Sequence, residues 1–287
     1  MLSNGQYLAE PYIRIFGLRL SPYRVIRHYL CKRENWPRLL FKYKAYDPMH
    51  LKDIIVNSCL YMSAVDQIND PFDSQSNLHF DNSGTSRNNY LTSLIKNNKV
   101  PYKQRAKLRN RLQSPEIIQA ELQKIRKNIV NNTGFFSFSA ESKNLLLWSH
   151  YSNSHKGVCL IFDVAQDIDV FVQCLPIKYS KDYPEVKYSE NLKGDLINAT
   201  FLTKADDWSY ENERRIFNTD RAHQKLAFSP KALYGIILGA KSDQNDIQLI
   251  KDLLVQREKI GGPKLKIFQS HISDSKYKVF YKLIRNF

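Results

Sequence analysis

Two glutamates and an arginine lie close together in the stretch W-S-Y-E-N-E-R-R-I-F at residues 208–217. Glu211, Glu213 and Arg215 alternate with other residues, and in an extended strand residues two apart point to the same face. Two carboxylates placed that close repel, so the pKa of one should rise unless Arg215 or another cation compensates. We therefore treat Glu211, Glu213 and Arg215 as the leading candidate for a functional site. The alternative is a solvated edge strand with a surface ion pair.

The composition is that of a globular protein with anionic partners. The chain has 287 residues, of which 43% are hydrophobic and 12% aromatic, well above the content of a disordered chain. The formal net charge of +15 favours nucleic acid, a nucleotide or an acidic protein as the partner. Basicity is shared by many proteins that bind no nucleic acid, so the charge alone does not decide among these.

The cysteines and the hydropathy pattern indicate the cellular compartment of the protein. Cys31, Cys59, Cys159 and Cys174 are far apart and form no C-x-x-C pair, which argues against a zinc site and a disulfide scaffold. The N-terminus lacks the apolar region of a signal peptide, and no stretch reaches the roughly 18 apolar residues of a membrane span. We expect a cytoplasmic protein with no membrane partner.

The elements that must position the two glutamates form an α+β pattern, with many short strands and a few helices. We expect a basic N-terminal arm or helix at residues 1–38, with proline at position 22 starting a helix to about Lys32. Residues 39–287 then form one α+β domain with a helical insertion at about 81–131. Strands are predicted at 39–44, 59–63, 134–139, 158–162, 208–217, 232–239, 265–269 and 279–284, and helices at 50–57, 144–151, 192–204 and 243–259.

The insertion contains a run of cations that is suited to a phosphate backbone. Its predicted nucleic-acid contacts are Lys103, Arg105, Lys107, Arg109 and Arg111. The alternative is a solvated helix surface. Aromatic residues are sparse here, which argues against a platform on which single-stranded bases stack.

The common catalytic signatures are missing. The sequence contains no Walker P-loop, G-x-G-x-x-G, H-E-x-x-H or G-x-S-x-G motif. His150 and His155 are five residues apart instead of the four that a helical metal pair needs, so we expect no metal site. We expect His150 or Tyr151 to line a pocket, while core packing is the alternative for Trp148 and Tyr151.

Several motifs together resemble a widespread, largely uncharacterised bacterial family. The chain has F-K-Y at 41–43, N-D-P-F-D at 69–73, W-S-H-Y at 148–151 with H-x-G at 155–157, and W-x-Y-E-x-E-x-R at 208–215. The family shares L-Y-K-Y, N-D-P-F-E, F-S-x-S, W-S-H-Y-A-x-x-H-x-G and W-x-x-E-x-E-x-R in the same order. Asn69, Asp70 and Phe72 match its turn motif. Asp73 stands where the family has Glu, and Ser152 where it has Ala.

The layout also resembles, more distantly, ADP-ribosyltransferase-like domains, which have a split β-sheet and use NAD as substrate. The resemblance places Tyr43 with Lys42 in the first motif of such domains, Ser139 and Tyr151 in the second, and the catalytic glutamate at Glu213. It therefore implies an ADP-ribosyltransferase-like split β-sheet core with a basic helical insertion. The implied activity is that of an ADP-ribosyltransferase or an NAD glycohydrolase.

The resemblance implies a role for each residue. Glu213 would hold the ribose and stabilise the positive charge that develops as the nicotinamide–ribose bond breaks, and Glu211 would orient or deprotonate the acceptor. Further contacts to NAD are expected from Tyr151 backed by Trp148 on nicotinamide, from Lys42 or Arg215 on the pyrophosphate, and from Tyr43, Ser139 and His150 in the pocket. The acceptor would be nucleic acid or an acidic protein, and the biological role that of a bacterial toxin or anti-phage defence effector with a possible neutralising partner.

Two alternatives remain open at this point. The first is a non-catalytic nucleic-acid-binding module, in which residues 211–215 form a structural ion-pair network. The second is a metal-dependent nuclease that uses Asp70, Glu211 and Glu213 around Mg²⁺, although the neighbouring lysines and arginines would compete with the metal.

Overall fold

The structure is a computed structural model that describes residues 13–15, 18–20, 37–80, 83–97, 99–112, 114–187 and 192–284. Near the N-terminus, strands β1 (Ile13–Ile15) and β2 (Leu18–Leu20) pair antiparallel. The helix predicted from residue 22 to about Lys32 lies outside the described residues.

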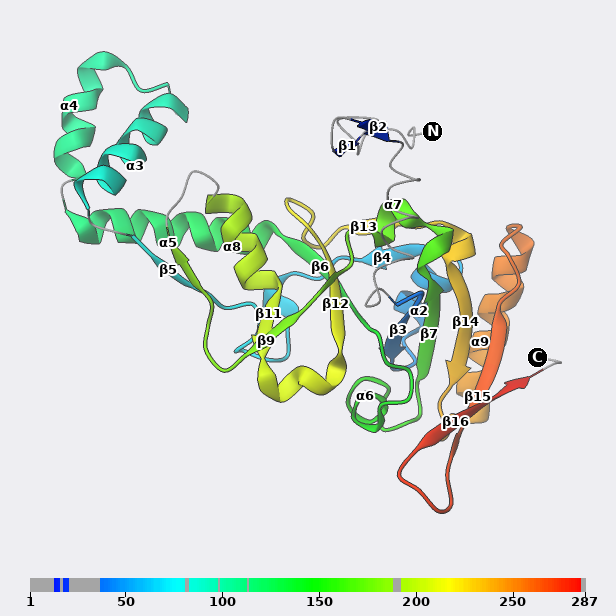
Figure 1. The fold of residues 1–287 in the computed structure, drawn as a ribbon. Coiled ribbons are helices and arrows are strands. Elements are labelled where there is room, and N and C mark those ends of the chain that lie inside the picture. Colours follow the sequence, from blue (N-terminus) through cyan, green and yellow to red (C-terminus); the bar gives the residue numbers. More distant parts are fainter. Residues whose placement is uncertain are drawn as a thin grey trace.

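An eight-stranded mixed sheet forms the centre of the fold (Figure 1). Its strand order is β16-β15-β14-β7-β3-β6-β12-β8, in which only the β14–β15 pair is parallel. The strands are β3 (Leu39–Lys44), β6 (Gly134–Ser139), β7 (Val158–Asp163), β8 (Leu175–Pro176), β12 (Glu213–Asn218), β14 (Leu233–Leu238), β15 (Lys266–Ile272) and β16 (Val279–Ile284). The α+β class predicted from the sequence is confirmed.

The sheet divides at its middle. β3 pairs with β7 along its whole length, from Leu39 to Lys44, but pairs with β6 only between Phe41 and Ser139. Beyond this point β3 and β6 part, and the side chains of both strands border the space between them. On its other edge β6 pairs with β12 in a regular ladder, with Ser139 opposite Glu213 and Ser137 opposite Arg215.

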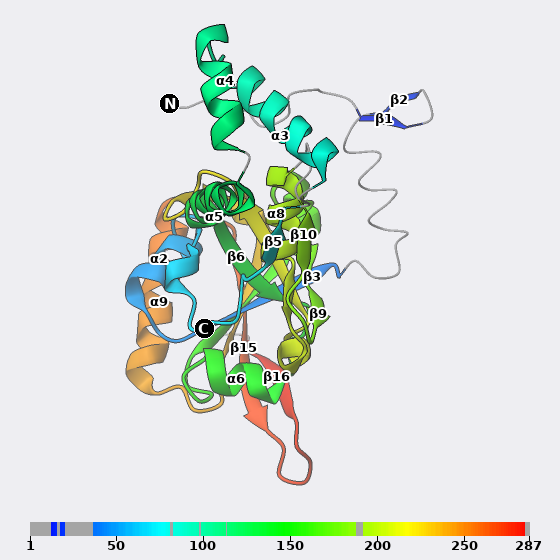
Figure 2. The ribbon, with the colours of Figure 1, turned by 90° about the vertical axis from the view of Figure 1, so that its left-hand side faces the viewer.

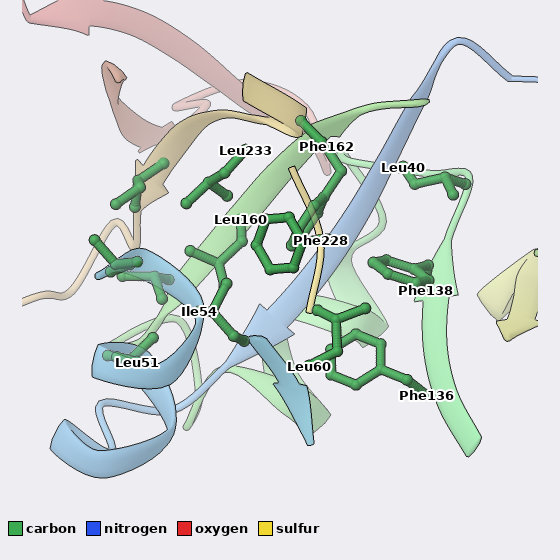
Figure 3. Packing of buried hydrophobic residues seen from close by; sticks show 14 of the residues in the cluster. Leu40, Leu51, Ile54, Leu60, Phe136, Phe138, Leu160, Phe162, Phe228 and Leu233 are labelled. Carbon is green, nitrogen blue, oxygen red and sulfur yellow. The ribbon is translucent and has the colours of Figure 1, made fainter. Parts of the chain in front are cut away.

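One face of the sheet carries the main hydrophobic core, which α2 (Pro48–Ile55) and α9 (Gln244–Lys259) cover. Leu40, Leu160 and Phe162 point into this core together with Leu51 and Ile54 of α2 (Figure 3). β7 is buried along its full length, as its uninterrupted apolar sequence predicts. α2 begins where Asp47 accepts a hydrogen bond from the His50 amide, with proline in the first turn.

The alternate residues of the same strands face the other way and pack under α6 (Leu145–Tyr151). Asn144 caps this helix by accepting hydrogen bonds from the amides of Leu146 and Leu147. The 3₁₀ helix η3 (Asp206–Glu211) leads into β12. Other short 3₁₀ and helical segments are η1 (Val65–Gln67), η2 (Val164–Gln166), α7 (Ile168–Phe171) and η4 (Pro230–Ala232).

Two-stranded ladders brace the loops around this sheet. They pair β4 (Cys59–Tyr61) with β13 (Lys225–Ala227), β9 (Lys178–Ser180) with β11 (Thr203–Ala205), and β5 (Asn77–His79) with β10 (Glu185–Lys187). β11 lies directly before η3 in the chain, so it brings Lys204 to the start of the glutamate segment.

The helical insertion forms a second, smaller core beside the sheet. It contains α3 (Gly84–Asn97), α4 (Tyr102–Arg111) and α5 (Pro115–Asn132), which pack with α8 (Leu192–Phe201), β5 and β10. Leu78, Leu122 and Leu196 are among its buried residues. α4 lies at the outer end of the molecule, away from the central sheet (Figures 1 and 2).

Two element predictions at the site were partly wrong. The helix predicted at 192–204 ends at Phe201, and Lys204 lies on strand β11. Residues 208–217 are not a continuous strand, because η3 extends to Glu211 and β12 begins at Glu213. Asn212 joins them in the left-handed region at φ 43°, a conformation that asparagine adopts more readily than most residues. Glu213 and Arg215 share one strand face as expected, whereas Glu211 reaches the same place from the end of a 3₁₀ helix.

Candidate functional site

A cavity of about 380 Å³ opens where β3 and β6 part. It is large enough for a small-molecule ligand. Outside the predicted nucleic-acid contacts, most of the site residues predicted from the sequence line this one cavity, although they come from five separate segments: Lys42, Tyr43, Asn69, Ser139, Tyr151, Glu211, Glu213 and Arg215.

Glu213 is a buried carboxylate held by two cations. Arg215 donates from Nε to Glu213 Oε1 at 2.6 Å, and Lys204 donates from Nζ to Glu213 Oε2 at 3.2 Å. Burial alone raises the pKa of Glu213, but the charges of Arg215 and Lys204 outweigh it, and the pKa falls well below its ordinary value. Glu213 is therefore ionised throughout the physiological range.

Arg215 is itself fully engaged by protein groups. It is 1% exposed and forms a bidentate pair with Asp73, at 2.9 Å from Nη1 to Oδ1 and 2.5 Å from Nη2 to Oδ2. All three guanidinium nitrogens donate to protein acceptors, including Glu213. The role predicted for Arg215 as a pyrophosphate contact does not fit this arrangement, and the arginine instead keeps the Glu213 carboxylate charged.

Glu211 has a different environment from its neighbour. Tyr151 donates its hydroxyl to Glu211 Oε1 at 2.5 Å, and Lys204 contacts Oε2 at 2.5 Å. Burial raises the pKa of Glu211, and although Lys204 lowers it, the charge of Glu213 raises it further, so that the net pKa is above its ordinary value. Ser139 fixes the segment by donating to the Glu211 carbonyl at 2.6 Å.

The site thus holds two carboxyl groups whose pKa values diverge. Glu213 stays charged, while Glu211 exchanges a proton closer to neutral pH. Such a divergence is a feature of acid–base active sites, where neighbouring carboxyls take different roles. Lys204, which contacts both, is 8% exposed, and its own pKa is raised because the two carboxylates outweigh the cost of burial.

Lys42 borders the same cavity from β3. Its ammonium donates to the Ser137 carbonyl at 2.8 Å and lies 4.6 Å from the centroid of the Phe136 ring. Burial and the charge of Lys44 lower the pKa of Lys42 to about 7. The lysine can therefore be neutral or charged at physiological pH, depending on what occupies the cavity.

Of three aromatic residues predicted to contact the ligand, Tyr43 lines the cavity, while Trp148 and His150 do not. Trp148 is 0% exposed, donates from Nε1 to the Ser142 carbonyl at 3.1 Å, and has no face open to a ligand. Tyr43 packs edge-on against Trp148 at 5.2 Å, and its hydroxyl donates to the Glu141 carbonyl. His150 is exposed and pairs with the Tyr210 hydroxyl at 3.1 Å, and it does not line the cavity.

The H-x-G pair of the same motif has a structural role. His155 stacks on Trp148 with ring centroids 6.1 Å apart, on the core side of α6. A side chain at Gly157 would collide with the Lys44 carbonyl, so the close approach of this turn to β3 requires glycine.

The turn motif contributes its first and last residues, Asn69 and Asp73, to the cavity. Asp70 Oδ1 accepts from the Phe72 amide at 2.9 Å, which shapes the turn, and the Phe72 side chain is 65% exposed. Asn69 lines the cavity from the turn. Asp73, 5% exposed, is the residue that enters the site through its pair with Arg215.

Sequence reasoning did not assign site roles to Asp73, Lys204 or Tyr179. Tyr179 accepts from the Glu213 amide at 2.8 Å and lies on β9, beside the strand of Lys204. Asp73 is the acidic residue that ends the N-D-P-F-D motif, and its place in that motif was the signal that could have pointed to a role in the site. No local pattern singles out Lys204, which reaches Glu211 and Glu213 only through the fold.

The carboxylates are not arranged to bind a metal. Over the part of the chain that the structure describes, no group of three His, Cys, Asp or Glu side chains has metal-site geometry. Lys204 and Arg215 occupy the oxygens of Glu211 and Glu213, and Asp70 does not line the cavity. The three acids of the nuclease alternative are therefore not brought together.

The predicted nucleic-acid contacts all lie on α4 and are exposed: Lys103, Arg105, Lys107, Arg109 and Arg111. No residue of α4 is buried. Arg111 pairs with Glu121 of α5 at 2.5 Å, and Arg105 donates to the Val100 carbonyl. This cationic surface is separate from the cavity at the central sheet (Figure 1).

Part of the chain matches a known family model. Residues 147–216 match the model of a family described as a protein of unknown function, DUF2971. The matched segment contains Tyr151, Lys204, Glu211, Glu213 and Arg215, but neither Lys42 nor Asp73. No curated protein and no solved structure matches the chain significantly.

The sequence predicts no membrane-spanning segment, and the helices of the structure can be compared with that prediction. Within the residues described, no helix has both the length and the apolar character needed to cross a bilayer.

Proposed function

We propose that the cavity is the active site of an NAD-using, ADP-ribosyltransferase-like enzyme. The observation that carries this proposal is the pair of glutamates with opposite pKa shifts in one cavity, Glu213 below and Glu211 above its ordinary value. Enzymes that transfer a glycosyl group use two carboxyl groups, one that stays charged and one that accepts a proton.

The two glutamates have distinct tasks in this reaction. As the bond between nicotinamide and ribose breaks, nicotinamide leaves with the electron pair and positive charge develops on the ribose. Glu213 stabilises that charge, and because Arg215 fixes its carboxylate beforehand, little reorganisation is needed. Glu211 accepts the proton of the hydroxyl or water that attacks the ribose carbon.

Tyr151 and Lys204 tune the proton acceptor. Both contact the Glu211 carboxylate, one as a hydroxyl donor and the other as a cation. They orient it for proton transfer, while Lys204 also limits the repulsion between Glu211 and Glu213. The two predicted outcomes, transfer to an acceptor and hydrolysis of NAD, differ only in the molecule that Glu211 deprotonates.

The test is NAD consumption by the purified full-length protein, with release of nicotinamide followed by chromatography. We expect Glu213→Gln to lower turnover by about 100-fold or more, because an electrostatic contact to the transition state is lost. Glu258→Gln, an exposed glutamate on α9, is the matched control and should leave turnover unchanged. Circular dichroism and thermal unfolding must show that the 213 variant remains folded, since the substitution also alters a buried ion pair.

A growth assay extends the test to the proposed biological role as a bacterial toxin or anti-phage defence effector. Expression of the wild-type chain should slow bacterial growth, and Glu213→Gln should restore it. The enzymatic proposal fails if the folded wild-type protein neither binds nor consumes NAD, alone or with nucleic acid or protein acceptors.

A second candidate function is nucleic-acid binding by α4. The observation that favours it is a helix with five cations, no acidic residue and no buried residue. Like charges four residues apart, such as Lys103 and Lys107, destabilise an isolated helix, and a phosphate backbone would relieve that repulsion.

The measurement is the affinity for a short DNA duplex over a range of salt concentrations. Replacing Lys103, Lys107 and Arg109 with Gln should weaken binding and reduce the slope of log affinity against log salt by about 2–3. The charge-matched control replaces Lys231, Lys259 and Lys276, which are exposed and lie outside α4. Equal affinity and slope in the two triple variants would exclude this function.

A further inference from the structure

The cavity has a second part that the two glutamates do not use. It continues past Lys42 and Lys44 of β3 to a wall formed by His50 of α2, Tyr61 of β4 and Gln67 of η1. None of the last three takes part in the proposed reaction.

Hydrogen bonds and chain connectivity give the order of groups along the cavity. Lys42 donates to the Ser137 carbonyl, which lies opposite Arg215 in the β6–β12 ladder, whereas Lys44 ends β3 three residues before Asp47 at the start of α2. Asp47 in turn accepts from His50 Nδ1 at 2.9 Å. The two lysines therefore lie between the glutamates at one end and the His50 wall at the other.

Within the described part of the chain, the ammonium groups of Lys42 and Lys44 have no carboxylate partner within salt-bridge distance. Both are partly buried, and they are two residues apart on one strand, so their ammonium groups repel. Among residues 37–80, 83–97, 99–112, 114–187 and 192–284, neither lysine forms a salt bridge within 4.0 Å. An anion in the cavity would offset both the repulsion and the cost of burial.

The far wall offers flat and polar surfaces. The rings of His50 and Tyr61 have centroids 5.9 Å apart and are tilted by 53°. Gln67 donates from Nε2 to the Tyr61 hydroxyl at 3.2 Å, and its amide is held beside the ring. An aromatic ring next to an amide is suited to a heterocyclic base, which stacks and forms hydrogen bonds along its edge.

We propose that Lys42 and Lys44 bind the phosphates of a nucleotide whose base lies against His50, Tyr61 and Gln67. The ligand class is thus a phosphorylated nucleoside, with its anionic part between the two ends of the cavity. This inference deepens the proposed function and rests on it only for the identity of the group that reaches Glu213.

The test measures binding of two fragments, AMP and inorganic pyrophosphate, to the full-length protein by calorimetry at fixed salt. Lys42→Met and Lys44→Met should each weaken both fragments about tenfold or more, since each removes a charge-assisted hydrogen bond. Tyr61→Ala should weaken AMP about tenfold and leave pyrophosphate unchanged, because only AMP carries a base. Lys276→Met, at the tip of the β15–β16 hairpin, is the charge-matched control and should change neither affinity.

Several results would overturn the inference. These are a wild-type protein that binds neither fragment, a Lys44→Met variant that binds both as tightly as the Lys276→Met control, and a Tyr61→Ala variant that retains full AMP affinity. The Tyr61→Phe variant keeps the ring and should retain AMP binding, so a loss in Tyr61→Ala is separated from a change in the hydroxyl.

The fragment experiment is independent of catalysis. Fragment binding as expected, without NAD consumption, would refute the proposed reaction and leave the nucleotide site standing. NAD consumption without the expected effects of Lys44→Met and Tyr61→Ala would refute the nucleotide site and leave the reaction standing.

Discussion

Lys204→Met provides a direct test of the buried charge network. The ammonium of Lys204 lies 2.5 Å from Glu211 Oε2 and 3.2 Å from Glu213 Oε2, and the side chain is 6% exposed. Methionine has a similar length and no charge. The substitution leaves Arg215 paired with Asp73 and Glu213, whereas Glu211 loses its salt bridge to Lys204.

The expected loss of folding stability follows from the burial of Lys204, Glu211 and Glu213. Removing one partner of a buried ion pair destabilises a protein by about 3–5 kcal/mol, because the remaining charge loses its compensation. The variant can reduce that cost by protonating Glu211, whose pKa is already raised by burial. We expect no comparable relief at Glu213, which Arg215 holds in its charged form.

This response makes the cost depend on pH with a defined sign. In the variant the folded-state pKa of Glu211 lies further above its unfolded value than in the wild type. Such a group contributes its full stability below the unfolded pKa and loses it as pH rises through the folded pKa. The loss of stability in Lys204→Met should therefore be larger at about pH 8 than at about pH 5, changing by up to about 1.4 kcal/mol per pH unit.

Urea unfolding followed by tryptophan fluorescence at several pH values measures this effect. Lys276→Met serves as the control, and as an exposed substitution it should change stability by less than about 0.5 kcal/mol at every pH. A loss of less than about 1 kcal/mol, or one that is the same at pH 5 and pH 8, would refute the reasoning.

Three further predictions follow from the same network and core. Asp73→Asn should destabilise the protein by about 3–5 kcal/mol in urea unfolding, because Arg215 loses its bidentate charged partner, and a change below about 1 kcal/mol would contradict this. Pyrophosphate affinity should fall as pH rises from about 7 to about 9, because Lys42, with a pKa of about 7, loses its charge, and calorimetry on Lys42→Met should show a flatter profile. The titratable groups that act on this lysine are Lys44, Lys204, Glu211 and Glu213. Trp148→Phe should cost about 1–3 kcal/mol of stability but leave AMP affinity unchanged, and an equal loss of both would place its ring in the site.

The sequence was sufficient to predict the local elements near the site. β3 and β6 have the predicted bounds, α6 and β7 lie within one residue of theirs, and the alternation of Glu213 and Arg215 on one strand face was correct. These elements have strong apolar periodicity, clear caps or alternation with small polar residues, which are local signals. Tyr43, Tyr151 and Glu213, which the resemblance assigned to one site, line one cavity.

The partners of the charged groups were not predictable in the same way. Arg215 meets Asp73 across 142 residues of sequence, and nothing near either residue specifies that pairing. The exposure of Trp148 and His150 depends on which strands lie under α6, so adjacent motif residues could not be divided into core and surface. The break in the strand at Asn212 had a local signal, since asparagine tolerates the left-handed conformation, but the alternating pattern around it favoured a strand.

The central claim is that Glu211 and Glu213 differ in charge state within one cavity. Carbon-13 NMR titration of the glutamate side-chain carboxyls tests it directly, with the two signals assigned through Glu211→Gln and Glu213→Gln. We predict that the Glu211 signal titrates above the ordinary glutamate value of 4.5, while the Glu213 signal remains that of a charged carboxylate at and below that pH. Two signals that titrate together near the ordinary value would contradict the account.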